Sequence, residues 1–183
     1  MSEDSNSHGL PEFSKPPLVE VALSVQFEPL VAFHVGHLGL FWARIRDRFQ
    51  KTQEQPPLPP TVERFGGKIP IQPQPQVLVG FPPPRCWFLD QNETELVQLQ
   101  SDRFIHNWRK VENQTIEYPR YARLKSKLRE ELSMLEGFVK HENLGQIVPN
   151  QCELTYINQI FSGPAAGSPP DISKVLAPWQ QQY

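Results

Sequence analysis

The sequence lacks a strong excess of charge of either sign and any long apolar run. Over 183 residues, 18 lysines and arginines are set against 20 aspartates and glutamates, which gives a formal net charge of −2. Charge alone therefore does not favour binding to nucleic acid or anionic lipid. No stretch approaches the ~20 apolar residues that cross a bilayer, and residues 1–9 are polar and acidic, unlike a signal peptide. These absences predict a soluble, cytoplasmic protein.

Cysteine and glycine are also scarce. Cys86 and Cys152 are the two cysteines, and both lie in apolar, strand-like runs, so we expect reduced, buried side chains. Glycine occurs 10 times against 20 prolines. Half of the prolines fall between residues 55 and 84, which predicts a long irregular connection stiffened by proline. The alternative function of this tract is as a polyproline ligand for an aromatic groove.

Hydrophobic periodicity predicts four strands and two helices. Strands are expected at 19–27, 85–89, 95–104 and 152–160, and amphipathic helices at 37–51 and 119–140. The order strand, helix, strand, strand, helix, strand predicts an α+β fold of ferredoxin-like type, with a four-stranded antiparallel sheet and two helices on one face. The alternative layout is a strand-helix-strand-strand module followed by a partial repeat.

Composition divides the chain into three parts. Residues 1–14 are expected to form a disordered tail, and residues 15–161 a single α+β domain that contains the proline-rich connection 55–84. Residues 162–183, which begin with a Gly/Pro/Ser-rich stretch, are expected to form a linker or tail.

Several short runs recur together in one group of proteins. They are Pro16-Pro17-Leu18-Val19-Glu20-Val21, Leu58-Pro59-Pro60, Arg85-Cys86-Trp87-Phe88, Gln98-Leu99-Gln100-Ser101-Asp102-Arg103-Phe104, Asn107-Trp108-Arg109, Tyr118-Pro119-Arg120-Tyr121 and Cys152-Glu153-Leu154-Thr155-Tyr156-Ile157-Asn158. In these runs the chain resembles a sporadically distributed, uncharacterised bacterial and archaeal protein family. The resemblance carries no activity, but a sporadic distribution suits mobile or defence-type systems. It also implies a further C-terminal region beyond the domain seen here.

Polar residues are concentrated between residues 98 and 109. If 95–104 is one strand, Gln98, Gln100 and Asp102 share a face and Arg103 lies on the other. Asn107, Trp108 and Arg109 follow, and an Asp and an Arg beside a Trp are suited to gripping a peptide or nucleotide. The alternative is structural, with Asp102 and Arg109 holding the strand end and Trp108 closing the core.

A polar sheet face is also expected. Glu20, Ser24 and Gln26 of the first strand and Glu153 and Thr155 of the last are expected to join Gln98 and Gln100 there. Such a surface is typical of protein binding or self-association, and the plain alternative is a solvated face. We therefore predict a non-enzymatic binding or regulatory domain that contacts a protein partner or itself and needs no cofactor.

The alternative function is binding or processing of nucleic acid. It would use four cations of the first predicted helix, Arg44, Arg46, Arg48 and Lys51. His34 and His37 have a spacing that can hold a metal, but no further ligand lies nearby in the sequence, so they are expected at the helix entry.

Overall fold

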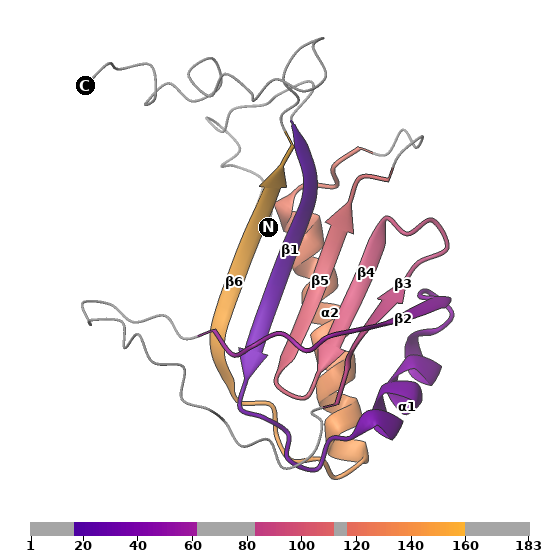
Figure 1. Ribbon diagram of the computed structural model, residues 1–183, viewed down its shortest axis with the longest axis vertical. Coiled ribbons are helices and arrows are strands. Elements are labelled where there is room, and N and C mark those ends of the chain that lie inside the picture. The colour runs from indigo at the N-terminus through magenta and orange to yellow at the C-terminus, as the bar shows by residue number, and fades with distance from the viewer. Residues whose placement is uncertain (1–16, 62–82, 112–116, 160–183) are drawn as a thin grey trace, which may run out of the picture. The chain divides into compact units, whose positions relative to one another are not determined.

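Strands dominate the part of the chain that the computed structural model describes, residues 17–61, 83–111 and 117–159. In chain order the elements are β1 (Leu18–Phe27), α1 (Val35–Ile45), β2 (Lys51–Gln55), β3 (Arg85–Leu89), β4 (Glu95–Gln100), β5 (Arg103–Arg109), α2 (Tyr121–His141) and β6 (Pro149–Asn158). The strands form a single six-stranded antiparallel sheet in the order β2-β3-β4-β5-β1-β6 (Figure 1).

The core lies between one face of the sheet and the two helices, and Figure 1 shows α2 behind the strands. Alternation in β1 and β5 sends apolar side chains to this face, where Val25 is paired with Phe104. From α1, Phe41 packs its ring against Phe88 and Phe138 with centroids 6.0 and 5.4 Å away. Burial of these rings, each worth about 1.5–3 kcal/mol, fixes the helices on the sheet.

The α+β class predicted from the sequence is confirmed, but the four-stranded ferredoxin-like sheet is wrong. The run 95–104 is two strands, because the chain turns at Ser101 and Asp102 and continues as β5. The first helix ends at Ile45, and Lys51–Gln55 forms the edge strand β2, whose polar sequence carries no alternation. Two strands were therefore missed: β5, whose start was assigned to the preceding strand, and β2, which has no alternating pattern.

Two other expectations fail on burial. Cys152 is exposed on the edge strand β6, whereas Cys86 is buried as expected. Glu131, whose charge led to its assignment to the wet side of the second helix, is 1% exposed and belongs to the face of α2 that packs on the sheet.

Glu20–Tyr156 forms one compact unit, and the described residues at its two ends, 17–19 and 157–159, fall outside that unit. The expected tail 1–14, the expected linker 162–183 and most of the connection 55–84 lie outside the described residues. No helix in the described ranges is long and apolar enough to cross a membrane.

Candidate functional site

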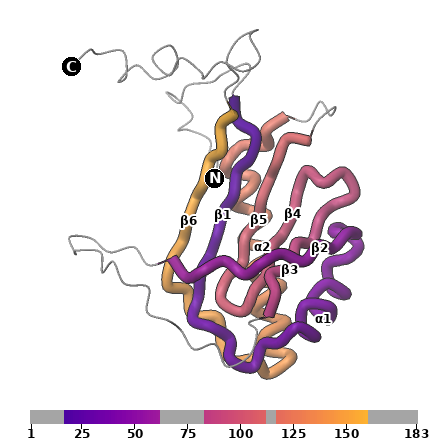
Figure 2. Tube along the Cα trace, viewed as in Figure 1, coloured from indigo at the N-terminus to yellow at the C-terminus, as the bar shows by residue number. Residues whose placement is uncertain are grey.

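The proline tract after β2 lies across the sheet face that points away from the helices. We call Pro56–Thr61 the strap, and Figures 1 and 2 show it passing in front of the strands. Leu58 donates its amide to Gln100 Oε1 (2.9 Å), and Gln100 Nε2 donates back to the Leu58 carbonyl (3.0 Å). Thr61 and Gln26 form the same two-way contact, at 2.8 and 3.0 Å. Two glutamine side chains thus clamp the strap as a neighbouring strand would.

The prolines explain why two clamps suffice. Proline has no amide hydrogen, so in Pro-Pro-Leu-Pro-Pro-Thr only Leu58 and Thr61 can donate from the backbone. Both donors are satisfied by the glutamine oxygens of Gln100 and Gln26. Within residues 56–61 of the tract predicted as a stiff connection, each backbone amide that can donate therefore has an acceptor on the sheet.

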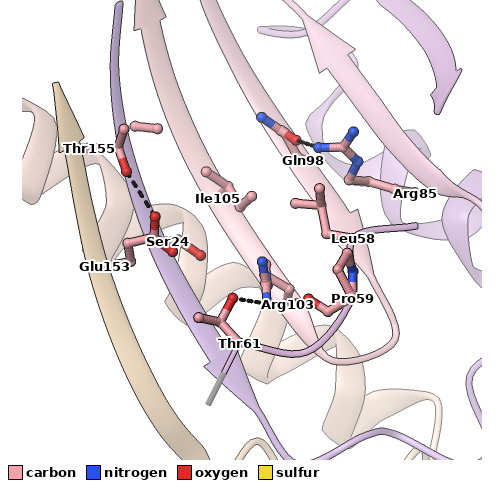
Figure 3. A pocket seen from close by; sticks show the side chains of 11 residues that line it. Ser24, Leu58, Pro59, Thr61, Arg85, Gln98, Arg103, Ile105, Glu153 and Thr155 are labelled. Atoms are coloured by element: carbon pink, nitrogen blue, oxygen red, sulfur yellow. Dashed lines mark hydrogen bonds between the residues drawn. The ribbon is translucent and has the colours of Figure 1, made fainter. Parts of the chain in front are cut away.

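A pocket of about 320 Å³ opens between the strap and the sheet (Figure 3). Its lining comes from the strap and five strands and comprises Ala22, Ser24, Leu58, Pro59, Thr61, Arg85, Gln98, Arg103, Ile105, Glu153 and Thr155. Ile105 gives it an apolar floor (Figure 3), Ala22 adds a second small apolar group, and the remaining lining is largely polar. The lining contains neither histidine nor cysteine.

Arginine dominates the charge of the pocket. Arg103 is 6% exposed and donates through Nη2 to Gln26 Oε1, to the Pro59 carbonyl (3.0 Å) and to Thr61 Oγ1 (3.2 Å). Arg85 donates through Nη1 to Gln98 Oε1 at 2.5 Å. Burial, and after it the positive charge of Arg103, lowers the pKa of Arg85. Within the described ranges, neither guanidinium forms an ion pair with a carboxylate.

A row of hydrogen bonds runs from the pocket across the sheet. Gln98 Oε1 accepts from Arg85 and from Trp87 Nε1 (2.9 Å), and Gln98 Nε2 donates to Asn107 Oδ1 (2.7 Å). Asn107 Nδ2 donates in turn to Glu20 Oε1 at 2.6 Å. These bonds fix the amide orientations of Gln98 and Asn107.

Some of the polar residues between 98 and 109 lie together on the pocket side of the sheet. The turn at Ser101–Asp102 makes Arg103 the cross-strand partner of Gln100, so the two share one face and the expected separation of Arg103 from Gln100 is wrong. Gln98 and Arg103 line the pocket, Gln100 holds the strap and Asn107 lies in the hydrogen-bonded row. Five strands and the strap thus share one polar face.

Asp102, Trp108 and Arg109 do not meet. Asp102 precedes β5 and accepts from Gln100 Nε2 at 2.6 Å. Trp108 lies on the opposite face of β5, 3% exposed, with its ring 5.4 Å from that of Tyr118. Arg109 ends the strand and donates from Nε to the Glu93 carbonyl at 2.7 Å. Each is used in a local contact, as the structural alternative expects.

The basic residues proposed for nucleic acid are largely paired with acids. Arg44 lies 3.3 Å from Glu142, and Lys51 lies 2.8 Å from Glu93. Arg48 contacts Glu95 and Glu131 at 2.9 and 2.8 Å. Of the four cations, Arg46 alone carries no ion pair within the described ranges. Because acidic side chains neutralise most of these cations, this surface offers little electrostatic attraction to phosphate.

His34 and His37 form the entry of α1. The His34 amide donates to His37 Nδ1 at 3.1 Å, and the two rings are in contact, tilted by 42° with centroids 3.8 Å apart. In the described part of the chain no group of three or more His, Cys, Asp or Glu side chains is placed to hold a metal ion.

Sequence reasoning missed Arg85 and the strap as parts of the site. Arg85 opens β3 on the same face as Trp87, opposite the buried Cys86 and Phe88, so strand alternation could have placed it on the polar face. The return of the strap onto the sheet has no local signal beyond the spacing of its two donors.

The chain matches no protein-family model, no curated protein and no solved structure. Its class is accordingly defined by its own geometry: an α+β unit with a six-stranded antiparallel sheet, helices on one face and a polar, strapped pocket on the other. The function has to be argued from that pocket.

Proposed function

We propose that Glu20–Tyr156 is a non-catalytic binding domain whose ligand occupies the pocket beneath the strap. The observation that carries the proposal is the pocket itself, about 320 Å³ in volume, with an apolar floor and converging polar side chains. Binding sites for small molecules have this composition, and this volume lies at the lower end of their range. A lining without histidine or cysteine suits recognition rather than acid–base or thiol chemistry.

Rigidity of the pocket supports the same conclusion. The glutamine clamps fix the strap on one side, and the row that starts at Gln98 fixes the amides on the other. A site whose groups are already ordered loses little entropy when a ligand binds. Preorganisation of this kind is expected in a binding site and is not needed on a merely solvated sheet face.

The test is a titration followed by amide NMR, with four probes added separately: sodium phosphate, sodium succinate, glucose and N-acetylglycinamide. We expect saturable shifts at Ser24 and Ile105 with at least one probe. Thr155→Trp, which places an indole in the pocket from the half-buried end of β6, should abolish them. Leu154→Trp is the matched control, because adjacent strand residues point to opposite faces. Absence of saturable shifts with all four probes would refute the proposal.

A second candidate function, self-association, is favoured by β6. Within the described ranges β6 has one neighbour, β1, and Leu154 and Tyr156 are 45% and 44% exposed. An edge strand of this kind can pair with the same strand of a second copy across a two-fold axis, which keeps the sheet antiparallel. Light scattering should then report a dimer that Leu154→Lys dissociates, and a monomer at all concentrations would exclude it.

A further inference from the structure

We propose that the pocket binds a small-molecule oxyanion, a carboxylate or a phosphate, gripped by the guanidinium groups of Arg85 and Arg103. This inference rests on the proposed function, because it names the ligand class of the same pocket. It follows from the charge balance of the lining, from the neutral surroundings of the buried Arg103 and from the size of the cavity.

Arg103 is a buried cation surrounded by neutral acceptors. Its three partners through Nη2 are a side-chain amide, a carbonyl and a hydroxyl, and its Nε is buried with no acceptor among the described residues. A buried charge with an unused donor is costly unless an opposite charge comes close. An oxyanion in the pocket would supply the opposite charge.

Arg85 brings a second positive charge to the same cavity. Its Nε donates to the Pro56 carbonyl at 3.2 Å and its Nη1 to Gln98, so both of its partners are neutral as well. Burial and the nearby Arg103 both lower the pKa of Arg85, which places the two like charges within each other's field. Paired guanidinium groups present fixed donors that match carboxylate and phosphate oxygens.

The opposite wall limits what the rest of the ligand can be. Thr155 donates its hydroxyl to Glu153 Oε1 at 2.9 Å, so this side of the pocket presents a carboxylate and a hydroxyl (Figure 3). Those groups suit a donor such as a hydroxyl or ammonium at the far end of the ligand. A volume of about 320 Å³ admits a small molecule and not a nucleic-acid strand.

The experiment compares the two anions with the neutral probes at constant ionic strength set with sodium chloride. Sodium phosphate and sodium succinate separate a tetrahedral from a carboxylate ligand. We expect one of them to saturate the Ser24 and Ile105 amide shifts and to move the Arg103 Nε–H signal. In Arg85→Gln the dissociation constant for that anion should rise tenfold or more, as the loss of a charge-assisted hydrogen bond predicts.

Variants separate binding from folding. Arg103→Gln should also lose the anion, but Arg103 is buried and its replacement can unfold the chain; Arg85 is only half-buried, so Arg85→Gln keeps the test decisive. Arg46→Gln, an exposed arginine far from the pocket lining, should bind as the parent does. Saturation by neither anion, or equal affinity in Arg85→Gln, would overturn the inference. If glucose or N-acetylglycinamide alone binds, the anion is refuted while the binding function stands.

Discussion

His106 Nδ1 lies 2.8 Å from Glu131 Oε2, with both side chains almost completely buried between β5 and α2. Arg48 Nη1 reaches the other oxygen of the same carboxylate, 2.8 Å from Oε1. A carboxylate inside the core thus joins the central sheet, α2 and the segment that follows α1.

Removing this carboxylate should destabilise the fold. Glu131→Ala leaves His106 and Arg48 without their shared partner, and the loss of one member of a buried pair costs about 3–5 kcal/mol. Urea unfolding followed by circular dichroism measures the change. Glu136→Gln, an exposed position on the same helix, is the control and should stay within about 0.5 kcal/mol. A loss for Glu131→Ala no larger than that of the control would contradict the role assigned to this pair.

The strap should loosen when one glutamine is replaced. Gln100→Leu removes both contacts to Leu58, and an unsatisfied amide of this kind costs about 1–3 kcal/mol. Hydrogen exchange at the Leu58 amide should accelerate more than at Thr61, which Gln26 still holds. Gln53→Leu on the exposed strand β2 is the matched control. Unchanged protection at Leu58 would show that the clamp does not restrain the strap.

Acid should weaken the fold through Glu95. Burial alone would raise the pKa of this carboxyl, but hydrogen bonds from Lys127 and Arg48 outweigh it and lower the pKa. A folded-state pKa below the unfolded value of about 4.3 stabilises the protein above that pH, and the gain is lost as pH falls through the folded pKa. Glu95→Gln should therefore flatten the decline of the unfolding free energy between about pH 5 and pH 3. An equally steep decline in the variant would exclude Glu95 as the cause.

The two cysteines should differ in reactivity. Burial raises the pKa of Cys86 to about 11, so at pH 8 its thiol is protonated as well as inaccessible. Cys152 is exposed on β6. Iodoacetamide and mass spectrometry should find Cys152 labelled in the native protein and Cys86 labelled only in denaturant. Rapid native labelling of Cys86 would be inconsistent with its burial.

Trp108 should matter for stability and not for binding. Trp108→Ala opens a cavity in the core and should cost about 3–5 kcal/mol. Trp108→Phe should cost much less, since it keeps an aromatic ring beside Tyr118 and removes an indole donor that has no acceptor in the described part of the chain. Probe binding by Trp108→Phe should equal that of the parent. A loss of probe binding in a stably folded Trp108→Phe variant would show that Trp108 does contribute to the binding site.

The elements that could be predicted from the sequence are those with a local pattern. Alternating apolar and polar residues predict the strands β1 and β3, and apolar residues at three- and four-residue steps predict the helix α2. β2 has no apolar face, so no local pattern marks it. The turn at Ser101 and Asp102 does have a local signal, since both residues favour turns, but the continuous strand-like run around it outweighed that signal. Glu131 continues the spacing of Leu128 and Leu135, but its charge conceals its place in the core.

For a related reason, only some of the residues of the candidate site could be predicted from the sequence. Gln98 and Arg103 lie in the polar segment that the sequence singles out, and both line the pocket. Arg85 and Leu58 come to them through long-range pairing, of β3 with β4 and of the strap with Gln100. Which polar groups converge is set by strand order, and strand order depended on the two strands that were missed.

The spacing of the two donors in the strap sets a limit on how this segment can change. Leu58 and Thr61 are three residues apart, which is one turn of a polyproline helix, so both amides can face the sheet together. One inserted residue between them would rotate the second donor by about a third of a turn, away from Gln26. The segment should therefore accept replacement of its outward prolines far more readily than any change in its length.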